Sequence, residues 1–119
     1  MINAVTLVTA DMAASVRFYE ALGFVVRYGG PDAAFTSFHA GEGYLNIQLD
    51  PSRAPVADIW GRAIFWVDDV DQIHRRVMEA GYRPITEPAD APWGERYFHV
   101  RDPDGHELSF ARLLDDDLP

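Results

Sequence analysis

The sequence predicts an α+β fold made of two tandem βαβββ units. Two observations lead to this prediction: one pattern recurs at an offset of 58 residues, and in each copy a helical pattern is followed by short strand-like segments. The copies span about residues 2–50 and 61–113, with a linker at 51–60 and a tail at 114–119. A length of 119 residues fits one domain, covering residues 1–119.

The repeat is clearest at two pairs of residues. Asp11 and Gly23 lie 12 residues apart, and so do Asp69 and Gly81. An aspartate before a helix accepts hydrogen bonds from the first free amides, and glycine adopts the left-handed conformation that ends a helix. Each copy is therefore predicted to contain one helix, and the first of these covers Met12–Leu22.

Strand-like segments surround each predicted helix. They are Ala4–Val8, Phe24–Tyr28, Ala34–His39 and Tyr44–Leu49 in the first copy, and Ala63–Val67, Arg83–Thr86, Arg96–Arg101 and Glu107–Ala111 in the second. Alternation within 44–49 and 96–101 predicts sheets with one face against a helix and the other away from it. Phe18 and Tyr19 are predicted to be core residues, whereas His74 and His106 are predicted to be exposed.

Charge and composition argue against several classes of partner and site. Ten arginines and no lysine stand against 19 acidic residues, and the net charge of −9 argues against nucleic acid and anionic membranes. The absence of cysteine excludes disulfides and thiolate metal sites. No apolar run approaches the ~20 residues that span a bilayer, and no signal-peptide pattern opens the chain, so a cytoplasmic location is expected.

The second copy carries the most distinctive motifs. Val67–Asp71 is followed by Pro92–Phe98, which reads PWGERYF, and then by Asp102–Gly105, which reads DPDG. In this order, and inside a repeat, they resemble the vicinal oxygen chelate superfamily of glyoxalases, extradiol dioxygenases and bleomycin-resistance proteins. The resemblance covers residues 2–113, and the spacing from Pro92 to Gly105 is most similar to the bleomycin-resistance or antibiotic-binding branch.

The resemblance implies curled mixed sheets around a cavity, with the helices outside. It also implies that two chains pair, so a homodimer is expected. Exposed sheet edges favour the same expectation, because unpaired strands need cover.

Catalytic members of this superfamily hold a divalent ion at four equivalent positions. The resemblance places these positions at Ala4, Gln48, Arg62 and Ser109. Histidine and carboxylate are the usual ligands, and neither a methyl group nor a guanidinium replaces them. We therefore expect no metal, no cofactor and no catalytic residue. A His99–Glu107 pair across one hairpin remains an alternative, either for a displaced metal or for proton transfer.

Without a metal, an aromatic cavity with a few polar groups is a binding site for a small molecule. The candidate ligand-binding residues are Phe35 or Phe38, Asn46, Gln48, Arg62, Trp66, Trp93, Tyr97, His99 and Glu107. Trp60 lies nearer the linker and is a candidate for a dimer contact instead.

Three functions follow from these observations. The first is non-catalytic binding, by which the protein sequesters an aromatic or cationic metabolite or antibiotic of the bleomycin kind. The second is a metal-dependent glyoxalase-, lyase- or dioxygenase-like enzyme with displaced ligands. The third is an interaction module without a small ligand. The fold by itself does not choose among them.

Overall fold

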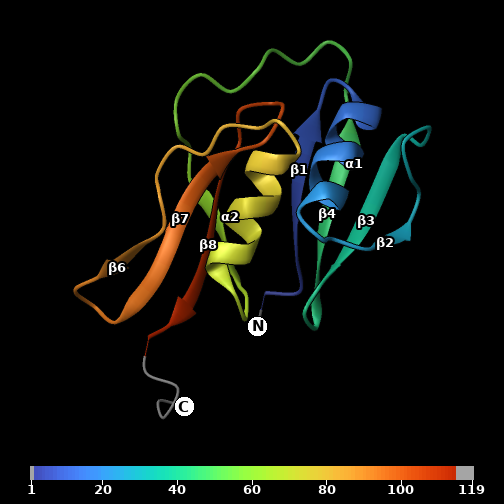
Figure 1. The fold of residues 1–119 in the computed structure, drawn as a ribbon. Helices are drawn as coiled ribbons and strands as arrows, with labels where there is room; N and C mark the ends of the chain where they lie inside the picture. The colour runs from blue at the N-terminus through green and yellow to red at the C-terminus, as the bar shows by residue number, and fades with distance from the viewer. Residues whose placement is uncertain (1, 115–119) are drawn as a thin grey trace. The chain divides into compact units, whose positions relative to one another are not determined.

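The computed structural model describes residues 2–114, and these form two compact units (Figure 1). The first unit runs to Ile59 and also includes Asp102–His106, and the second contains Trp60–Arg101 and the chain from Glu107 onward. Residues 115–119 of the predicted tail lie outside the described residues. None of the described helices is long and apolar enough to span a membrane.

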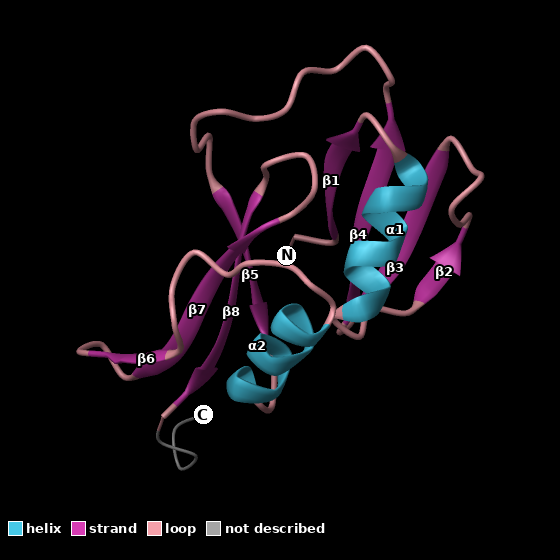
Figure 2. Ribbon diagram, turned by 45° about the horizontal axis from the view of Figure 1, so that its top comes forward, coloured by secondary structure: helices cyan, strands magenta, loops and turns pink. Residues whose placement is uncertain are grey.

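The first unit is one helix on one four-stranded sheet. Its elements are β1 (Ala4–Thr9), α1 (Met12–Ala21), β2 (Val26–Tyr28), β3 (Phe35–Ala40) and β4 (Gly43–Leu49). The strand order is β1-β4-β3-β2, with β1 parallel to β4 and the other pairs antiparallel. Figure 2 shows α1 lying along one face of this sheet.

The second unit repeats this topology. Its elements are β5 (Arg62–Trp66), α2 (Val70–Glu79), β6 (Ala89–Ala91), β7 (Glu95–Arg101) and β8 (Glu107–Leu113). The strand order is β5-β8-β7-β6, again with one parallel pair, β5 with β8. The predicted α+β fold of two βαβββ units is confirmed, and neither sheet closes on itself.

The helix ends follow from the residues that the sequence singled out. Asp11 and Asp69 each accept a hydrogen bond from the backbone N–H three residues further on, at 3.1 and 3.0 Å. Gly23 follows α1 at φ +105°, a conformation that costs a residue with a Cβ about 1–2 kcal/mol. The first helix ends at Ala21, one residue earlier than predicted.

Aromatic side chains fill the layer between each helix and its sheet. In the first unit the Tyr19 ring lies 5.5 Å from both Phe24 and Phe38, and Phe18 and Tyr19 are fully buried, as predicted. In the second unit Phe98 and Phe110 stack at 5.6 Å. These contacts define one covered face and one open face for each sheet.

Two predictions about the second unit are wrong. Residues 83–86 do not form a strand: they contribute an isolated bridge between Pro84 and Val100, and the edge strand is β6 instead. Proline has no N–H to donate to a ladder, which explains why pairing does not extend through this segment. His74 is half-buried rather than exposed, because its ring packs edge-on against Phe98 at 5.2 Å.

The turn between β7 and β8 is built into the first unit. The Tyr19 hydroxyl donates to Asp102 Oδ2 at 2.6 Å, and Asp102 Oδ1 accepts the His106 N–H at 2.9 Å. The His106 ring donates from Nε2 to the Val8 carbonyl at 2.8 Å, so the prediction that His106 is exposed is wrong. Burial raises the pKa of both Tyr19 and Asp102. The DPDG turn therefore reverses the chain and also forms buried hydrogen bonds with the first unit.

Candidate functional site

The face of the second sheet that points away from α2 carries most of the predicted site residues. Side chains alternate along a strand, so those between Phe98, Val100, Leu108 and Phe110 lie on the opposite face from these buried residues. We define this open face by Arg62, Ile64 and Trp66 of β5, Tyr97, His99 and Arg101 of β7, and Glu107, Ser109 and Ala111 of β8.

Strand pairing arranges these nine residues in three rows across the sheet. The first row is Trp66–Ala111–Tyr97, the second is Ile64–Ser109–His99, and the third is Arg62–Glu107–Arg101. In the first two rows a small residue of β8 stands between larger side chains of β5 and β7. The third row is charged. The open face thus has an aromatic part and an ionic end.

The aromatic part continues from Tyr97 to Trp93. The two rings are nearly parallel, at 24° with centroids 6.0 Å apart, and the Tyr97 and His99 rings are 5.1 Å apart. Trp93 is 68% exposed and Trp66 is 63% exposed, which is high for tryptophan. These exposed rings offer flat apolar area on which another flat molecule can stack.

Trp93 lies on a hairpin loop that is fixed by hydrogen bonds of Gly94 and Arg96. Gly94, at φ +91°, donates its N–H to the Ala91 carbonyl at 3.0 Å and closes the turn. On the next strand Arg96 forms two hydrogen bonds with the Asp71 carboxylate, at 2.8 and 2.9 Å, and one with Asp90 at 2.9 Å. Asp71 is on α2, so these hydrogen bonds connect the β6–β7 hairpin to the helix on the covered face.

At the ionic end, Glu107 forms an ion pair with Arg62. Arg62 Nε donates to Glu107 Oε2 at 2.6 Å, and Arg62 Nη2 contacts the same oxygen. Arg101 is the β7 neighbour of Glu107. A carboxylate that already faces one guanidinium and lies beside another has little negative field left for a ligand.

His99 lies between the aromatic part and the ionic end. Burial, followed by the charge of Arg62, lowers its pKa, while Glu107 acts in the opposite direction. The direct His99–Glu107 pair considered from the sequence does not form, because the strand partner of His99 is Ser109 and its Nδ1 has no hydrogen-bond partner among the described residues. Burial and the charge of Arg62 therefore both favour the neutral form of the ring.

In the first unit, three of the predicted residues share the open face and one does not. Phe35, Asn46 and Gln48 lie on the face of the first sheet away from α1. Phe38 is fully buried against Tyr19 on the covered face. Strand alternation separates Phe35 from Phe38, because they are an odd number of residues apart.

The open face of the first sheet also holds a cluster that the sequence did not single out. The Arg27 guanidinium lies 4.6 Å from the centre of the Tyr44 ring, and His39 packs against the same ring at 6.2 Å. A cation over an aromatic face stabilises both groups. The order of the three residues along the chain contains no signal for this cluster, because it depends on the pairing of β3 with β4.

The four positions equivalent to metal ligands also lie on open faces. Ala4 and Gln48 are on the first sheet, and Arg62 and Ser109 are on the second. Within residues 2–114 no three metal-ligating side chains come together. A methyl group and an ion-paired guanidinium do not fit a divalent ion, because they supply no lone pair to it.

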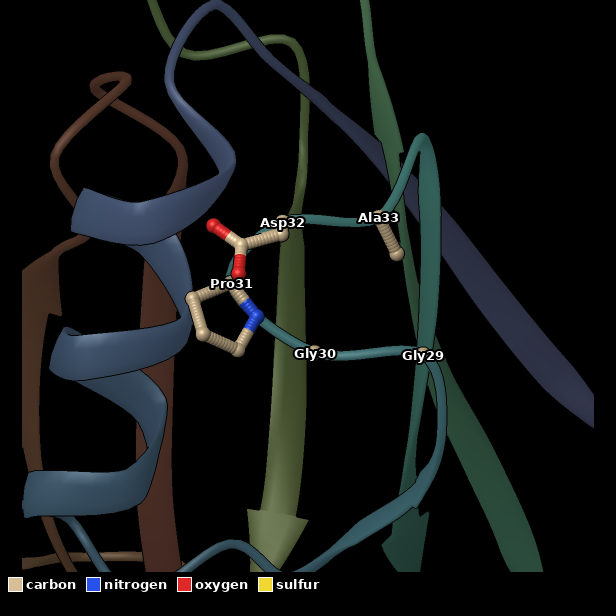
Figure 3. Close-up of a pocket in the computed structure, with 5 residues that line it drawn as sticks. All are labelled: Gly29, Gly30, Pro31, Asp32 and Ala33. Atoms are coloured by element: carbon tan, nitrogen blue, oxygen red, sulfur yellow. The ribbon is translucent and has the colours of Figure 1, made fainter.

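A hollow in the first unit is lined by Gly29, Gly30, Pro31, Asp32 and Ala33 (Figure 3). The segment is the turn between β2 and β3. Thr36 Oγ1 accepts the Gly30 N–H at 3.0 Å and donates to the Gly30 carbonyl at the same distance. The turn is therefore closed by its own hydrogen bonds, and the hollow is wide open to solvent.

Solved structures of several other proteins have the same fold. A bleomycin-binding protein solved in complex with bleomycin is 24% identical, covers 94% of this chain and 97% of its own, and has a TM-score of 0.72. TioX from Micromonospora sp. ML1 is 27% identical over 96% of this chain and 99% of its own, with a TM-score of 0.74. A lactoylglutathione lyase from Agrobacterium tumefaciens is 22% identical over 94% of this chain and 92% of its own, with a TM-score of 0.73.

Among curated proteins, none matches the chain. The profile of the Glyoxalase/Bleomycin resistance protein/Dioxygenase superfamily matches residues 1–110. This match covers both βαβββ units, and the structural neighbours have the same fold. The chain belongs to the glyoxalase/bleomycin resistance protein/dioxygenase superfamily, the vicinal oxygen chelate superfamily that its repeat and its second-copy motifs resemble.

Proposed function

We propose that this protein binds a planar small molecule on the open face of its second sheet and acts by sequestration, without catalysis. The observation that carries this proposal is the exposed side chain of Trp93, whose ring is nearly parallel to that of Tyr97. Both residues belong to the hairpin that Arg96 connects to Asp71 of α2. Trp66, His99, Arg62 and Glu107 complete the proposed contact surface. A protein of the same fold binds bleomycin, which supports a ligand of the antibiotic or metabolite class.

Catalysis has less support than binding. The residues at the superfamily's ligand positions do not fit a metal, and Glu107 faces Arg62 rather than His99. Sequestration needs affinity alone. When a ligand covers the exposed rings, each Å² of apolar surface buried contributes about 25 cal/mol to the binding free energy.

A neutral planar probe, 2-naphthamide, tests the proposal without any contribution from charge. In titration calorimetry, Trp93→Ala should weaken its binding about tenfold or more, because stacking and buried area at one tryptophan contribute roughly 1–3 kcal/mol. Trp60→Ala is the matched control, since Trp60 is 60% exposed but precedes β5 and lies outside the open face. Equal affinities for Trp93→Ala and the wild type would remove Trp93 from the site.

We also propose a homodimer in the cytoplasm. β5, with the sequence RAIFW, is an edge strand, and its outer backbone edge has no strand partner among the described residues. An exposed apolar edge strand is a pairing surface. Light scattering at micromolar concentration should give twice the mass of the chain, and a stable monomer would contradict the dimer.

A further inference from the structure

The charge on the open face of the second sheet is unevenly distributed along β7. The open-face residues of this strand are Glu95, Tyr97, His99 and Arg101, in that order. Arg101 and Glu95 are separated by six residues, which is about 20 Å at 3.3 Å per residue. The two charges that β7 places on the open face therefore lie at opposite ends of the aromatic part.

The arginine end carries more positive than negative charge. Arg62 and Arg101 flank Glu107 in one cross-strand row, and Arg62 holds a single oxygen of the carboxylate. Arg101 is exposed and forms no ion pair with any residue in 2–114. One guanidinium therefore remains uncompensated at this end.

The uncompensated arginine outweighs the overall charge of −9 for a ligand in contact with this row. At physiological ionic strength the Debye length is about 8 Å, so acidic side chains across the surface are screened. Neighbouring residues on paired strands have Cβ atoms about 5 Å apart, well inside that length. Burial is the main cause of the lowered pKa of His99, and of the two charges that act on this pKa, Arg62 has a larger effect than Glu107.

We propose that the ligand of this face is a planar molecule that carries an anionic group, such as an aromatic carboxylate. Its ring stacks beside Trp93 and Tyr97, and its carboxylate reaches the Arg62–Glu107–Arg101 row. This class differs from the cationic ligand that was considered from the sequence. The inference rests on the binding function proposed above and adds the chemical class of the ligand.

Three probes of one size separate the charge preference from binding itself. They are 2-naphthoate, neutral 2-naphthamide and trimethyl(2-naphthyl)ammonium, titrated by calorimetry into the full chain at low and physiological salt. The wild type should bind naphthoate about tenfold more tightly than the ammonium probe, and salt should reduce the difference. Naphthamide should have an intermediate affinity.

Single substitutions identify the charges responsible. Arg101→Gln should weaken naphthoate binding about three- to tenfold and leave naphthamide unchanged. Glu107→Gln should strengthen naphthoate binding by a similar factor, because it releases Arg62. Arg75→Gln is the matched control, since it changes the net charge equally but is an exposed residue of α2, on the covered side of the sheet. It should leave all three affinities unchanged.

The outcomes distinguish this inference from the function on which it rests. If the ammonium probe binds as tightly as naphthoate while naphthamide still depends on Trp93, the anionic ligand is wrong and the binding function stands. If Arg75→Gln weakens naphthoate binding as much as Arg101→Gln, overall charge rather than this row is responsible, and the inference fails. If no probe binds, the proposed function fails as well, and a second copy of the chain is the occupant to test by sedimentation.

Discussion

Tyr19 on α1 donates a 2.6 Å hydrogen bond to Asp102 at the start of the β7–β8 turn, across a separation of 83 residues. Both side chains are buried, and Asp102 also accepts the backbone N–H groups of Asp104 and His106. A buried carboxylate without these donors costs several kcal/mol. The contact therefore binds a turn from the second repeat into the core of the first unit.

Removal of the Tyr19 hydroxyl should destabilise the protein. Tyr19→Phe keeps the ring contacts with Phe24 and Phe38 but leaves Asp102 Oδ2 without its donor, at a cost of about 1–3 kcal/mol. Chemical denaturation measures the loss. Tyr28→Phe, at an exposed tyrosine of β2, is the control and should change the free energy of unfolding by less than about 0.5 kcal/mol.

Asp102 should also make stability depend on pH in a direction opposite to that of most carboxylates. Burial raises its pKa in the folded state above the ordinary 3.8, so between the two pKa values the folded chain holds a proton that the unfolded chain has released. Its contribution to the free energy of unfolding therefore falls as the pH rises through that window.

The comparison with Asp102→Asn isolates this effect, because the other titrating groups cancel. The difference in unfolding free energy, wild type minus variant, should decline as the pH rises from about 4 towards neutrality. Urea denaturation at a series of pH values measures it. A difference that grows over the same range would mean that the carboxylate is stabilised in its charged form.

Trp93 should contribute little to stability, in contrast to an aromatic residue of the covered face. Because Trp93 is largely exposed, Trp93→Ala should shift the melting temperature by only a few degrees. Phe98 is fully buried, and Phe98→Ala should cost about 3–5 kcal/mol. Thermal melts of the two variants test the assignment of these residues to opposite faces, and a large loss with Trp93→Ala would place Trp93 in the core.

Alanine substitutions at two glycines of the second repeat distinguish the cost of backbone strain from the cost of a steric clash. Gly94 and Gly105 have φ values of +91° and +89°, so alanine at either position is strained by about 1–2 kcal/mol. A Cβ at Gly94 meets nothing within 4 Å, whereas one at Gly105 lies 2.4 Å from the Val56 carbonyl oxygen. Gly105→Ala should therefore cost about 1–3 kcal/mol more than Gly94→Ala in denaturation experiments.

Local sequence signals predicted most of the fold. Asp11 and Asp69 accept the capping hydrogen bonds expected of them, and the strands of the first repeat lie within two residues of their predicted bounds. The failure at 83–86 has a physical cause: this segment has the residue types of a strand, but Pro84 has no N–H to donate, so only an isolated bridge to Val100 forms. The edge strand β6 pairs with a different part of β7, at residues 95–97.

The sequence predicted which side chains of β7 share a face but not how the charges pair. Alternation placed Tyr97 and His99 on one face of a strand, and the structure brings Trp93 and Trp66 to the same face. That Glu107 is held by Arg62 was not predicted, because the two residues are 45 positions apart and meet only through the β5–β8 pairing.

The sequence by itself determined what local periodicity and capping control: two helices, most strands of the two repeats, and which side chains of a strand share a face. Only the tertiary structure decided which strands pair and in what register, and therefore that Arg62, Glu107 and Arg101 form one row. It also decided that the turn containing Asp102 is buried against Tyr19. The physical reason is that a contact between distant residues depends on the free energy of the whole packed unit, whereas a turn or a cap depends on a few neighbours.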